Sequence, residues 1–296
     1  KNEVILPAYG WIASANAIRA AGLKAVFADI NDQFYISTES VKSLMNTKTL
    51  AVMPVNFSGR IGSDVWRLVD LCKKNFIPII EDCAQAFGAW NSSNPAKKLF
   101  VSGNIGKISC LSINPMKTLA SHGEGGGVLT DDDEIASFAR QYRYQGMESG
   151  LYVGDGVNAR METLQAAIVL INLTLYEQII DIKRNIADVY SRNLADYCVV
   201  PVEDFSELHT YFSYQILTPH RDELQIYLSD NAIETQIQHY PLMCDTPIFK
   251  NSPRACLKTA ERISKTSSCL PCHEKMTTDE INYVVSRVKC FFKTKK

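Results

Sequence analysis

Residues 1–130 alternate between short apolar runs, rich in β-branched side chains, and segments with helical spacing. Helical spacing is clear in SANAIRAAG, which ends at Gly22, and in SDVWRLVDLCKKN. The runs that predict strands are VILP (4–7), KAVFADI (24–30), TLAVMPVNF (49–57), IPIIEDC (77–83), ISCLSI (108–113) and GGVLT (126–130). This alternation is typical of a mostly parallel sheet with helices on both faces. We therefore predict a three-layer α/β fold.

From Met161 the pattern changes, because helical periodicity continues for more than thirty residues without a proline. A helix of that length often joins a large domain to a small one, or packs on a partner subunit. Beyond it we predict a strand in YFSYQILTP, a helix in RDELQIYLSDNA, an irregular stretch with prolines and a final helix from Thr278. The sequence thus predicts a large domain over residues 1–200 and a smaller α+β domain over residues 201–296.

The charge balance favours a small-molecule partner. The formal net charge is −1, so the chain has no basic excess to hold a nucleic acid or an anionic membrane. No apolar stretch is judged long enough to span a membrane, and no signal peptide opens the sequence. We therefore expect a cytoplasmic protein that binds neither nucleic acid nor membrane.

The nine cysteines are an odd number, and several of them lie in apolar runs, as a reducing compartment allows. Cys269, Cys272 and His273 have the spacing of a c-type haem attachment site. No second Cys/His pair is spaced to complete a zinc site, so we predict no metal. The structural alternative is a short strand and a turn before the last helix, and we prefer it.

Polar side chains follow three of the predicted strands. Glu81, Asp82 and Gln85 follow one strand, and Ser112 and Lys117 follow another. Ligands of parallel α/β sheets bind beyond the carboxyl ends of the strands, so these groups are expected to share one crevice.

Trp11 follows a third strand and adds an aromatic ring to this set. An amine, a carboxylate, a hydroxyl and a flat ring suit pyridoxal 5′-phosphate, which needs a Schiff-base lysine, an anion at its pyridine nitrogen and a stacking face. Each residue also has a structural alternative: Lys117 as a solvated lysine, Asp82 as a helix cap, Trp11 as a core residue. These patterns alone predict an α/β enzyme and leave the cofactor open.

The order and spacing of several segments resemble the DegT/DnrJ/StrS family of sugar aminotransferases. The segments that carry the resemblance are VILPAYGWIASANAI, VFADI, PVNFSGR, IIEDCAQAFGA, GNIGKISCLSINPMKTL, GEGGGVLTDD and VNARMETLQAAI. The carboxyl-terminal part resembles the family more weakly, in RDELQIYL, HYP and LPCHEKMTTDE. The resemblance implies the fold of aspartate aminotransferase and pyridoxal phosphate as the cofactor.

The resemblance also implies roles for residues at the strand ends. Lys117 matches the lysine that binds the cofactor as a Schiff base and then moves a proton. Asp82 matches the partner of the pyridine nitrogen, and Gln85 matches the glutamine near the ring hydroxyl. Trp11 matches the aromatic residue stacked on the ring, and Ser112 matches a phosphate ligand.

Three further residues are assigned in the same way. Asn158 matches an asparagine that reaches the phosphate from the other subunit, which implies a homodimer with shared active sites. His239 and Tyr240 match a segment that the family places near the sugar. The substrates implied are glutamate or glutamine as the amino donor and a keto group of a nucleotide-linked sugar or cyclitol as the acceptor.

The chain departs from the family pattern in several places. Asn56 and Ser58 replace a polar and an aromatic residue of the family's loop. Lys117 is retained, unlike in the dehydratase branch, where a histidine replaces it. The family's usual amino-terminal segment, which helps to bind the phosphate, is not found before the first strand, so we expect a segment to be missing upstream. The alternative function is therefore a truncated relative that dimerises without binding the cofactor.

Overall fold

The computed structural model describes residues 1–295. Two three-stranded groups, ordered β2-β1-β3 and β4-β7-β8, are joined by a parallel bridge between Val52 and Ile79. Their strands are β1 (Glu3–Pro7), β2 (Lys24–Ala28), β3 (Thr49–Val52), β4 (Ile80–Asp82), β7 (Ile108–Ser112) and β8 (Gly126–Leu129). All neighbours are parallel except β8, which runs antiparallel to β7. The predicted mostly parallel sheet is confirmed.

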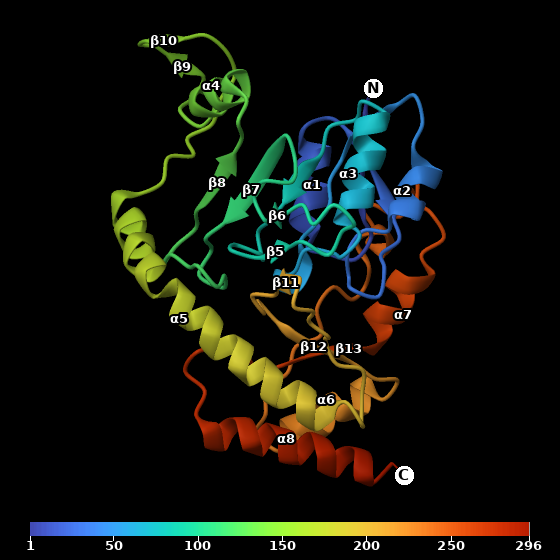
Figure 1. Ribbon diagram of the computed structural model, residues 1–296. Helices are drawn as coiled ribbons and strands as arrows, with labels where there is room; N and C mark the ends of the chain where they lie inside the picture. Colours follow the sequence, from blue (N-terminus) through green and yellow to red (C-terminus); the bar gives the residue numbers. More distant parts are fainter. Residues whose placement is uncertain (296) are drawn as a thin grey trace.

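Helices cover both faces of this sheet, as Figure 1 shows. Along β1, Val4 and Leu6 point into one apolar cluster and Ile5 points into the other, which is the two-residue period of a strand buried on both sides. The first cluster contains side chains of α1 (Ile12–Ala20) and α7 (Lys258–Thr266), and the second those of α2 (Thr38–Leu44) and α3 (Val65–Lys74).

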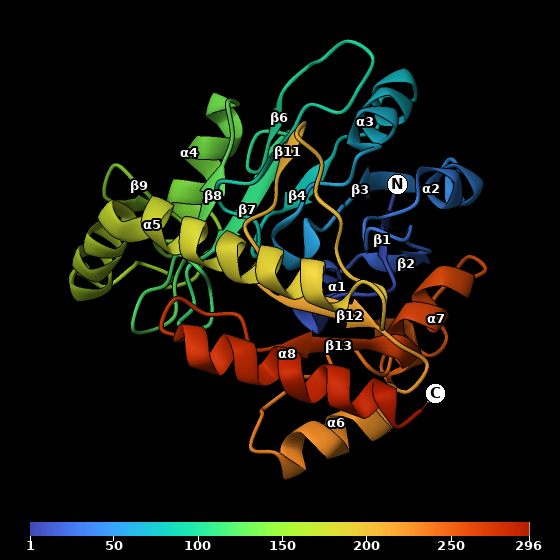
Figure 2. The same ribbon diagram turned by 60° about the horizontal axis from the view of Figure 1, so that its bottom comes forward.

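The predicted long helix is α5 (Thr163–Leu194), which runs from beside the large sheet to the lower end of the molecule in Figure 1 and crosses in front of that sheet in Figure 2. Its middle part packs against the loop after β7, through contacts of Tyr176 and Ile180 in a cluster with Leu119. Its last turns, with Tyr190 and Leu194, belong to a separate cluster. The helix therefore links the two ends of the fold.

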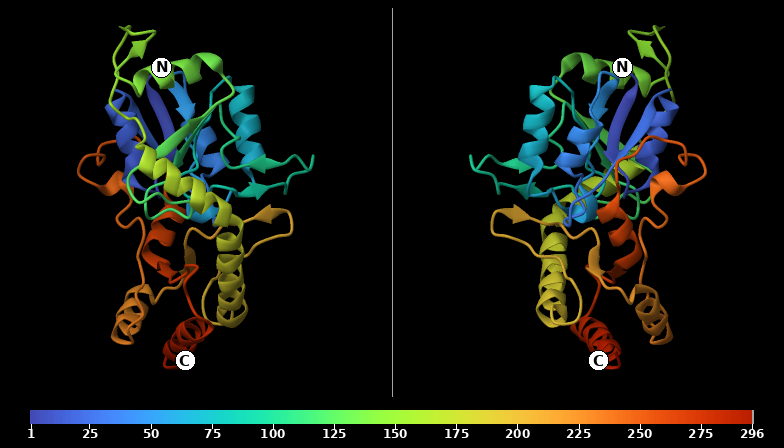
Figure 3. Two further views of the ribbon diagram at one scale, coloured as in Figure 1. Left: turned by 90° about the vertical axis from the view of Figure 1, so that its left-hand side faces the viewer. Right: turned by 90° about the vertical axis from the view of Figure 1, so that its right-hand side faces the viewer.

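That separate cluster is the core of the carboxyl-terminal part, which lies below the sheet in Figure 3. It is built from the antiparallel pair β12 (Tyr214–Leu217) and β13 (Ser267–Leu270), with α6 (Arg221–Asp230) and α8 (Thr278–Lys293). The final helix starts where predicted, because Thr277 and Glu280 form a reciprocal capping box. The domain boundary after residue 200 stays a prediction.

Two predicted segments differ from the structure. The run 49–57 was predicted as one strand, but β3 ends at Val52, and Pro54, which has no N–H to donate, follows. The stretch predicted as irregular contains α7, whose Ala260 and Ile263 pack on the large sheet.

Three short strands form a separate antiparallel sheet, in the order β11-β5-β6, at the junction between the two parts of the molecule. They are β5 (Trp90–Asn91), β6 (Phe100–Val101) and β11 (Glu207–Leu208). Arg60 pairs with Glu207 beside this sheet. Segments distant in sequence are thus fixed to one another close to the ends of β3 and β4.

A further segment projects away from the sheet at the upper left of Figure 1. It consists of α4 (Asp133–Tyr142), β9 (Met147–Glu148) and β10 (Leu151–Tyr152). No residue of α4 is buried, and Phe138 is exposed although it lies on an amphipathic helix. Beside this segment, β8 is the last strand of its sheet within residues 1–295.

One helix, α5, is long and apolar enough to cross a membrane by length and composition alone. The expectation that no stretch reaches this length was therefore wrong. One face of its second half packs inside the protein, with Ile186, Ala187 and Tyr190 buried.

Candidate active site

Lys117 lies on the loop between β7 and β8, past the carboxyl end of β7. Its backbone N–H donates to the carbonyl of Asn114 at 2.8 Å, which makes a tight turn directly before the lysine. Helix α5 holds the same loop, because Nδ2 of Asn172 donates to the carbonyl of Ala120 at 2.7 Å. The half-buried lysine is therefore carried by a loop that is fixed on two sides.

Asp82 ends β4, the strand next to β7. Its Oδ2 accepts from the hydroxyl of Ser14 on α1 at 2.6 Å, and its Oδ1 accepts from the N–H of Ala84 at 3.1 Å. Glu81, its neighbour in sequence, lies on the opposite face and is fully buried. Its carboxylate accepts hydrogen bonds from Asn56, Ser102, Gly103, Ile105 and Ser109. Glu81 is thus committed to internal bonds, whereas Asp82 remains available at the strand end.

Two titratable groups meet near these strand ends. Burial lowers the pKa of the Lys117 ammonium, and the carboxylates of Asp82 and Glu124 act against this effect. Burial, and after it the charge of Lys117, lowers the pKa of His239 to about 4. The imidazole of His239 packs on the rings of Tyr9 and Phe57, with centroids 5.1 and 4.8 Å away. His239 is therefore neutral at physiological pH.

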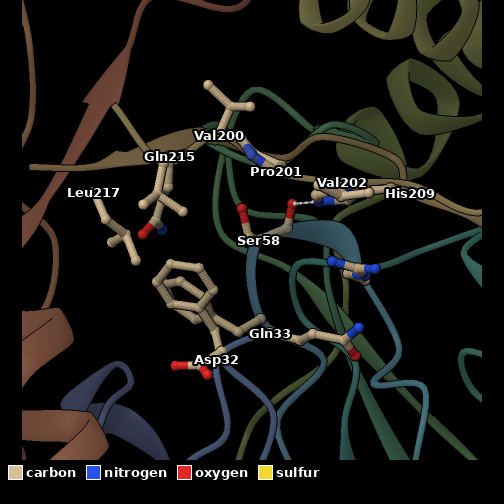
Figure 4. Close-up of a pocket in the computed structure, with 13 residues that line it drawn as sticks. Asp32, Gln33, Ser58, Val200, Pro201, Val202, His209, Gln215 and Leu217 are labelled. Atoms are coloured by element: carbon tan, nitrogen blue, oxygen red, sulfur yellow. Dashed lines mark hydrogen bonds between the residues drawn. The ribbon is translucent and has the colours of Figure 1, made fainter. Parts of the chain in front are cut away.

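Gln85 is oriented by the loop after β3. Its Oε1 accepts from the backbone N–H of Ser58 at 2.7 Å, so its amide N–H₂ is free to donate elsewhere. Ser58 has a left-handed φ of 61°, and its hydroxyl lies 2.7 Å from the carbonyl of Ser213. Its own carbonyl lies 3.0 Å from Nε2 of His209, the dashed contact in Figure 4.

Ser58 and His209 also line a cavity of about 240 Å³ between the large sheet and the segment 199–202 (Figure 4). A larger cavity of about 780 Å³ begins at Met116, next to Lys117. Phe212, Gln236 and Gln238 line it from the carboxyl-terminal part. The larger cavity gives the lysine loop an approach from outside.

The other predicted residues are placed less closely. Trp11 precedes α1 and is 66% exposed, with its ring centroid 6.4 Å from that of His239. Ser112 is the last residue of β7, and its hydroxyl lies 3.4 Å from the N–H of Asn114. Tyr240 is exposed, and its ring lies 5.4 Å from the guanidinium carbon of Arg221.

Asn158 is not brought to Lys117 within one chain by any contact. It is exposed, and its backbone pairs with Tyr144 in the projecting segment that includes α4 and β9. Its Oδ1 lies 3.4 Å from Nε of Arg160.

Two neighbours of the site were missed by the sequence analysis. The hydroxyl of Ser14 bonds to Asp82, and the ring of Phe212 lies 5.0 Å from Nζ of Lys117. Ser14 lies in the first turn of α1, just after Trp11, so its position past β1 was a usable signal. No such signal in the sequence pointed to Phe212, because Phe212 and Lys117 are far apart along the chain.

Cys269, Cys272 and His273, which have the spacing of a haem attachment site, lie in β13 and in the segment that follows it. Cys269 lies in β13 and is buried, as a strand residue before a turn would be. The thiol of Cys272 lies 3.7 Å from the carbonyl of Lys183, and burial raises its pKa to about 11. Among residues 1–295, no cluster of three or more His, Cys, Asp or Glu is arranged to hold a metal ion.

The donor set at the strand ends meets the chemical needs of pyridoxal phosphate. Lys117 supplies an amine of lowered pKa, and Asp82 supplies a carboxylate from the next strand. Within the described residues, the hydroxyl of Thr118 and Nε2 of His239 are buried without a hydrogen-bond partner. Buried polar atoms normally have partners, so these two are suited to meet a polar ligand. The residues present fit the cofactor.

Comparisons with known proteins agree with this chemistry. The chain is 32% identical to GDP-perosamine synthase of Escherichia coli O157:H7, over 99% of this chain and 80% of the relative. It is 31% identical to a pleiotropic regulatory protein of Geobacillus stearothermophilus, over 99% and 79%. The crystal structure of DesV from S. venezuelae superposes with a TM-score of 0.90 at 26% identity, over 98% of this chain and 78% of DesV.

The sheet, the lysine after β7 and the carboxylate at the end of β4 define a class, the aminotransferases that depend on pyridoxal phosphate. The similar structures belong to the same class. The model of the DegT/DnrJ/EryC1/StrS aminotransferase family matches residues 1–289, and the chain belongs to this family.

Proposed function

We propose that this aminotransferase moves an amine from glutamate or glutamine to a keto group of a nucleotide-linked sugar or a cyclitol. The relatives include enzymes named for such reactions, among them a UDP-2-acetamido-2-deoxy-3-oxo-D-glucuronate aminotransferase of Pseudomonas aeruginosa, 29% identical over 96% of this chain and 77% of the relative. One observation carries the proposal: a half-buried lysine of lowered pKa lies in the electrostatic field of Asp82, on adjacent strand ends.

The residues of this chain would divide the work as follows. Bound pyridoxal phosphate supplies an electron sink and carries the amine between the two substrates. Lys117 would anchor it and then move a proton as general acid and base, a role that a lowered amine pKa favours. Asp82 would supply the negative charge that keeps the pyridine nitrogen protonated. Gln85 would donate from its amide N–H₂ to the ring hydroxyl, since its oxygen already accepts from the N–H of Ser58.

The remaining predicted residues would serve the phosphate and the substrate. Ser112 would donate to the phosphate from the end of β7, and Trp11 would stack on the cofactor ring. His239 and Tyr240 would contact the sugar, with His239 as a neutral hydrogen-bonding group because burial and Lys117 lower its pKa to about 4. The cavity beside Met116 gives the substrates a route to Lys117.

We further propose that two copies of the chain associate and share their sites. Large apolar side chains are exposed on β8, α4, β10 and the first half of α5. Monomeric proteins rarely expose large apolar patches to water. We call this the α4–α5 surface and define it by Val128, Phe138, Leu151, Leu164, Leu170 and Ile171. Asn158 lies in the same projecting segment, so a second copy covering this surface would bring its own Asn158 towards the partner's phosphate. The nine free thiols suit a reducing compartment, and we propose the cytoplasm.

The test is the absorption spectrum of the purified chain with added pyridoxal phosphate, followed by borohydride reduction and peptide mapping. A yellow protein labelled at Lys117, whose colour is bleached by glutamate, is the expected result. A labelled lysine at any other position would refute the assignment of Lys117. A colourless protein would refute the proposed function for this chain and would favour a relative that dimerises without the cofactor.

A further inference from the structure

The segment 209–213 connects β11 to β12 and passes beside the candidate site. Its Phe212 presents the face of its ring to Lys117, with Nζ 5.0 Å from the ring centroid. A cation within about 6 Å of an aromatic centroid is attracted by the negative face of the ring. Phe212 also lines the larger cavity, so its side chain borders both the lysine amine and this cavity.

Hydrogen bonds fix the backbone on both sides of Phe212. The N–H of Thr210 donates to the carbonyl of Gly59 at 2.9 Å, and the hydroxyl of Ser58 lies 2.7 Å from the carbonyl of Ser213. A side chain at Gly59 would lie 2.9 Å from the backbone nitrogen of Phe212, so the loop after β3 is pressed against the segment. The carbonyl of Phe212 accepts from Nζ of buried Lys183 at 3.5 Å.

We propose that Phe212 is a positioning residue for Lys117, holding the free amine against its ring and favouring the protonated form. This inference rests on the proposed function, because it concerns the states in which the lysine amine is released. In those states the lysine must act as acid and as base, so both of its protonation states have to be accessible.

Several other groups around Lys117 also affect whether its amine is protonated. Burial favours the neutral amine, whereas Asp82 from β4 and Glu124 from the lysine loop favour the ammonium. His239, from the segment after α6, is neutral and repels no charge. The ring of Phe212 acts in the same direction as the two carboxylates, but without taking up a proton or forming an ion pair that would immobilise the amine.

The experiment measures the reactivity of Lys117 towards reductive methylation across pH, by peptide mass spectrometry of the full chain without the cofactor. Phe212→Leu removes the ring but keeps an apolar side chain, and Phe212→Tyr keeps the ring face. Because the ammonium loses a favourable contact, Lys117 in Phe212→Leu should react about threefold faster at a pH below its pKa. Phe212→Tyr should match the wild type.

Phe100→Leu is the matched control, because Lys98 also lies 5.0 Å from the centroid of the Phe100 ring, in a lysine–ring pair that does not include Lys117. It should leave the profile of Lys117 unchanged. Phe212 is only partly buried, so folded variants are expected, and thermal unfolding verifies this. Phe212→Met fills the same space if the leucine variant is unstable.

Two results would overturn the inference: profiles of Phe212→Leu and wild type that coincide, or an equal shift in the leucine and tyrosine variants, which would indicate packing alone. The readout does not need the cofactor. A shifted profile in a chain that never turns yellow would therefore contradict the proposed function while preserving the contact, and the two failures are distinguishable.

Discussion

The side chains of the candidate site have partners within this chain, whereas those of the α4–α5 surface are exposed to water. At the strand ends, Asp82, Gln85 and Ser58 each have a partner within this chain, and only selected polar atoms are left free. On the α4–α5 surface, large apolar side chains are exposed on β8, α4, β10 and α5. The site is therefore nearly organised by one copy of the chain, whereas the surface is organised for contact with another.

The strongest test of this contrast is Lys117→Ala. Loss of the anchoring amine and of the general acid–base should lower turnover by about 10²- to 10⁴-fold or more. Borohydride labelling at position 117 should disappear as well. Lys250→Ala, at an exposed position, is the control and should behave as the wild type. Turnover retained in Lys117→Ala would place the chemistry elsewhere in the molecule.

Asp82→Asn sharpens the account of the site, since it removes the charge and keeps the shape. Turnover should fall about a hundredfold, the size of effect seen when one electrostatic partner of a reaction is removed. Glu124→Gln is the matched variant, because both carboxylates raise the pKa of Lys117 but only Asp82 is proposed to contact the cofactor. Both variants should make Lys117 less basic, and only Asp82→Asn should lose turnover to this extent. Equal losses would mean that both carboxylates act through the lysine alone.

The surface is tested by a pair of substitutions at positions of equal exposure. Leu170 on α5 and Ile226 on α6 are each 66% exposed, and only Leu170 belongs to the α4–α5 surface. Leu170→Lys should weaken self-association by about 10²-fold, because a two-fold interface would contain the new charge twice. Ile226→Lys should leave it unchanged, as measured by sedimentation equilibrium. A monomeric wild type, or equal effects of the two substitutions, would contradict the proposed dimer.

The smallest expected effect is a pH dependence of stability. Burial, with the charge of Arg60, lowers the pKa of His209 to about 3 in the folded protein. An unfolded histidine takes up a proton near pH 6.5, so the free energy of unfolding should fall as pH decreases below that value. The contribution of His209 is at most about 1.4 kcal/mol per pH unit.

The measurement is urea unfolding at pH 7.0 and at pH 5.5. His209→Gln should reduce the pH dependence, although it also lowers stability at pH 7 through the lost contact with Ser58. His122→Asn, at an exposed position, should keep the wild-type dependence. An unchanged slope in His209→Gln would mean that His209 titrates alike in both states.

The sequence predicted the parts of the molecule that repeat a local pattern. Each strand end with polar residues was visible because strands and helices alternate, and α5 was visible because no proline interrupts it. Helix α7 was missed, since it is short and the residue before it, Leu257, provides no side-chain cap as a signal.

The contacts that complete the site could not be predicted in the same way. Ser58 bonds to Gln85 through a backbone N–H, which every residue but proline carries, and at a left-handed φ that serine rarely adopts. Phe212 reaches Lys117 only because two segments far apart in sequence are pressed together at Gly59. Such contacts depend on the tertiary path and leave no periodic trace in the sequence.

The position of β8 at the end of its sheet has a practical consequence. Among residues 1–295, β8 pairs with β7 on one side only, and all four of its residues are exposed. An open strand edge offers a template on which other chains add by backbone hydrogen bonding. None of its four residues carries a charge that would deter such growth, so aggregation in concentrated solutions should begin at this edge wherever a second copy does not cover Val128.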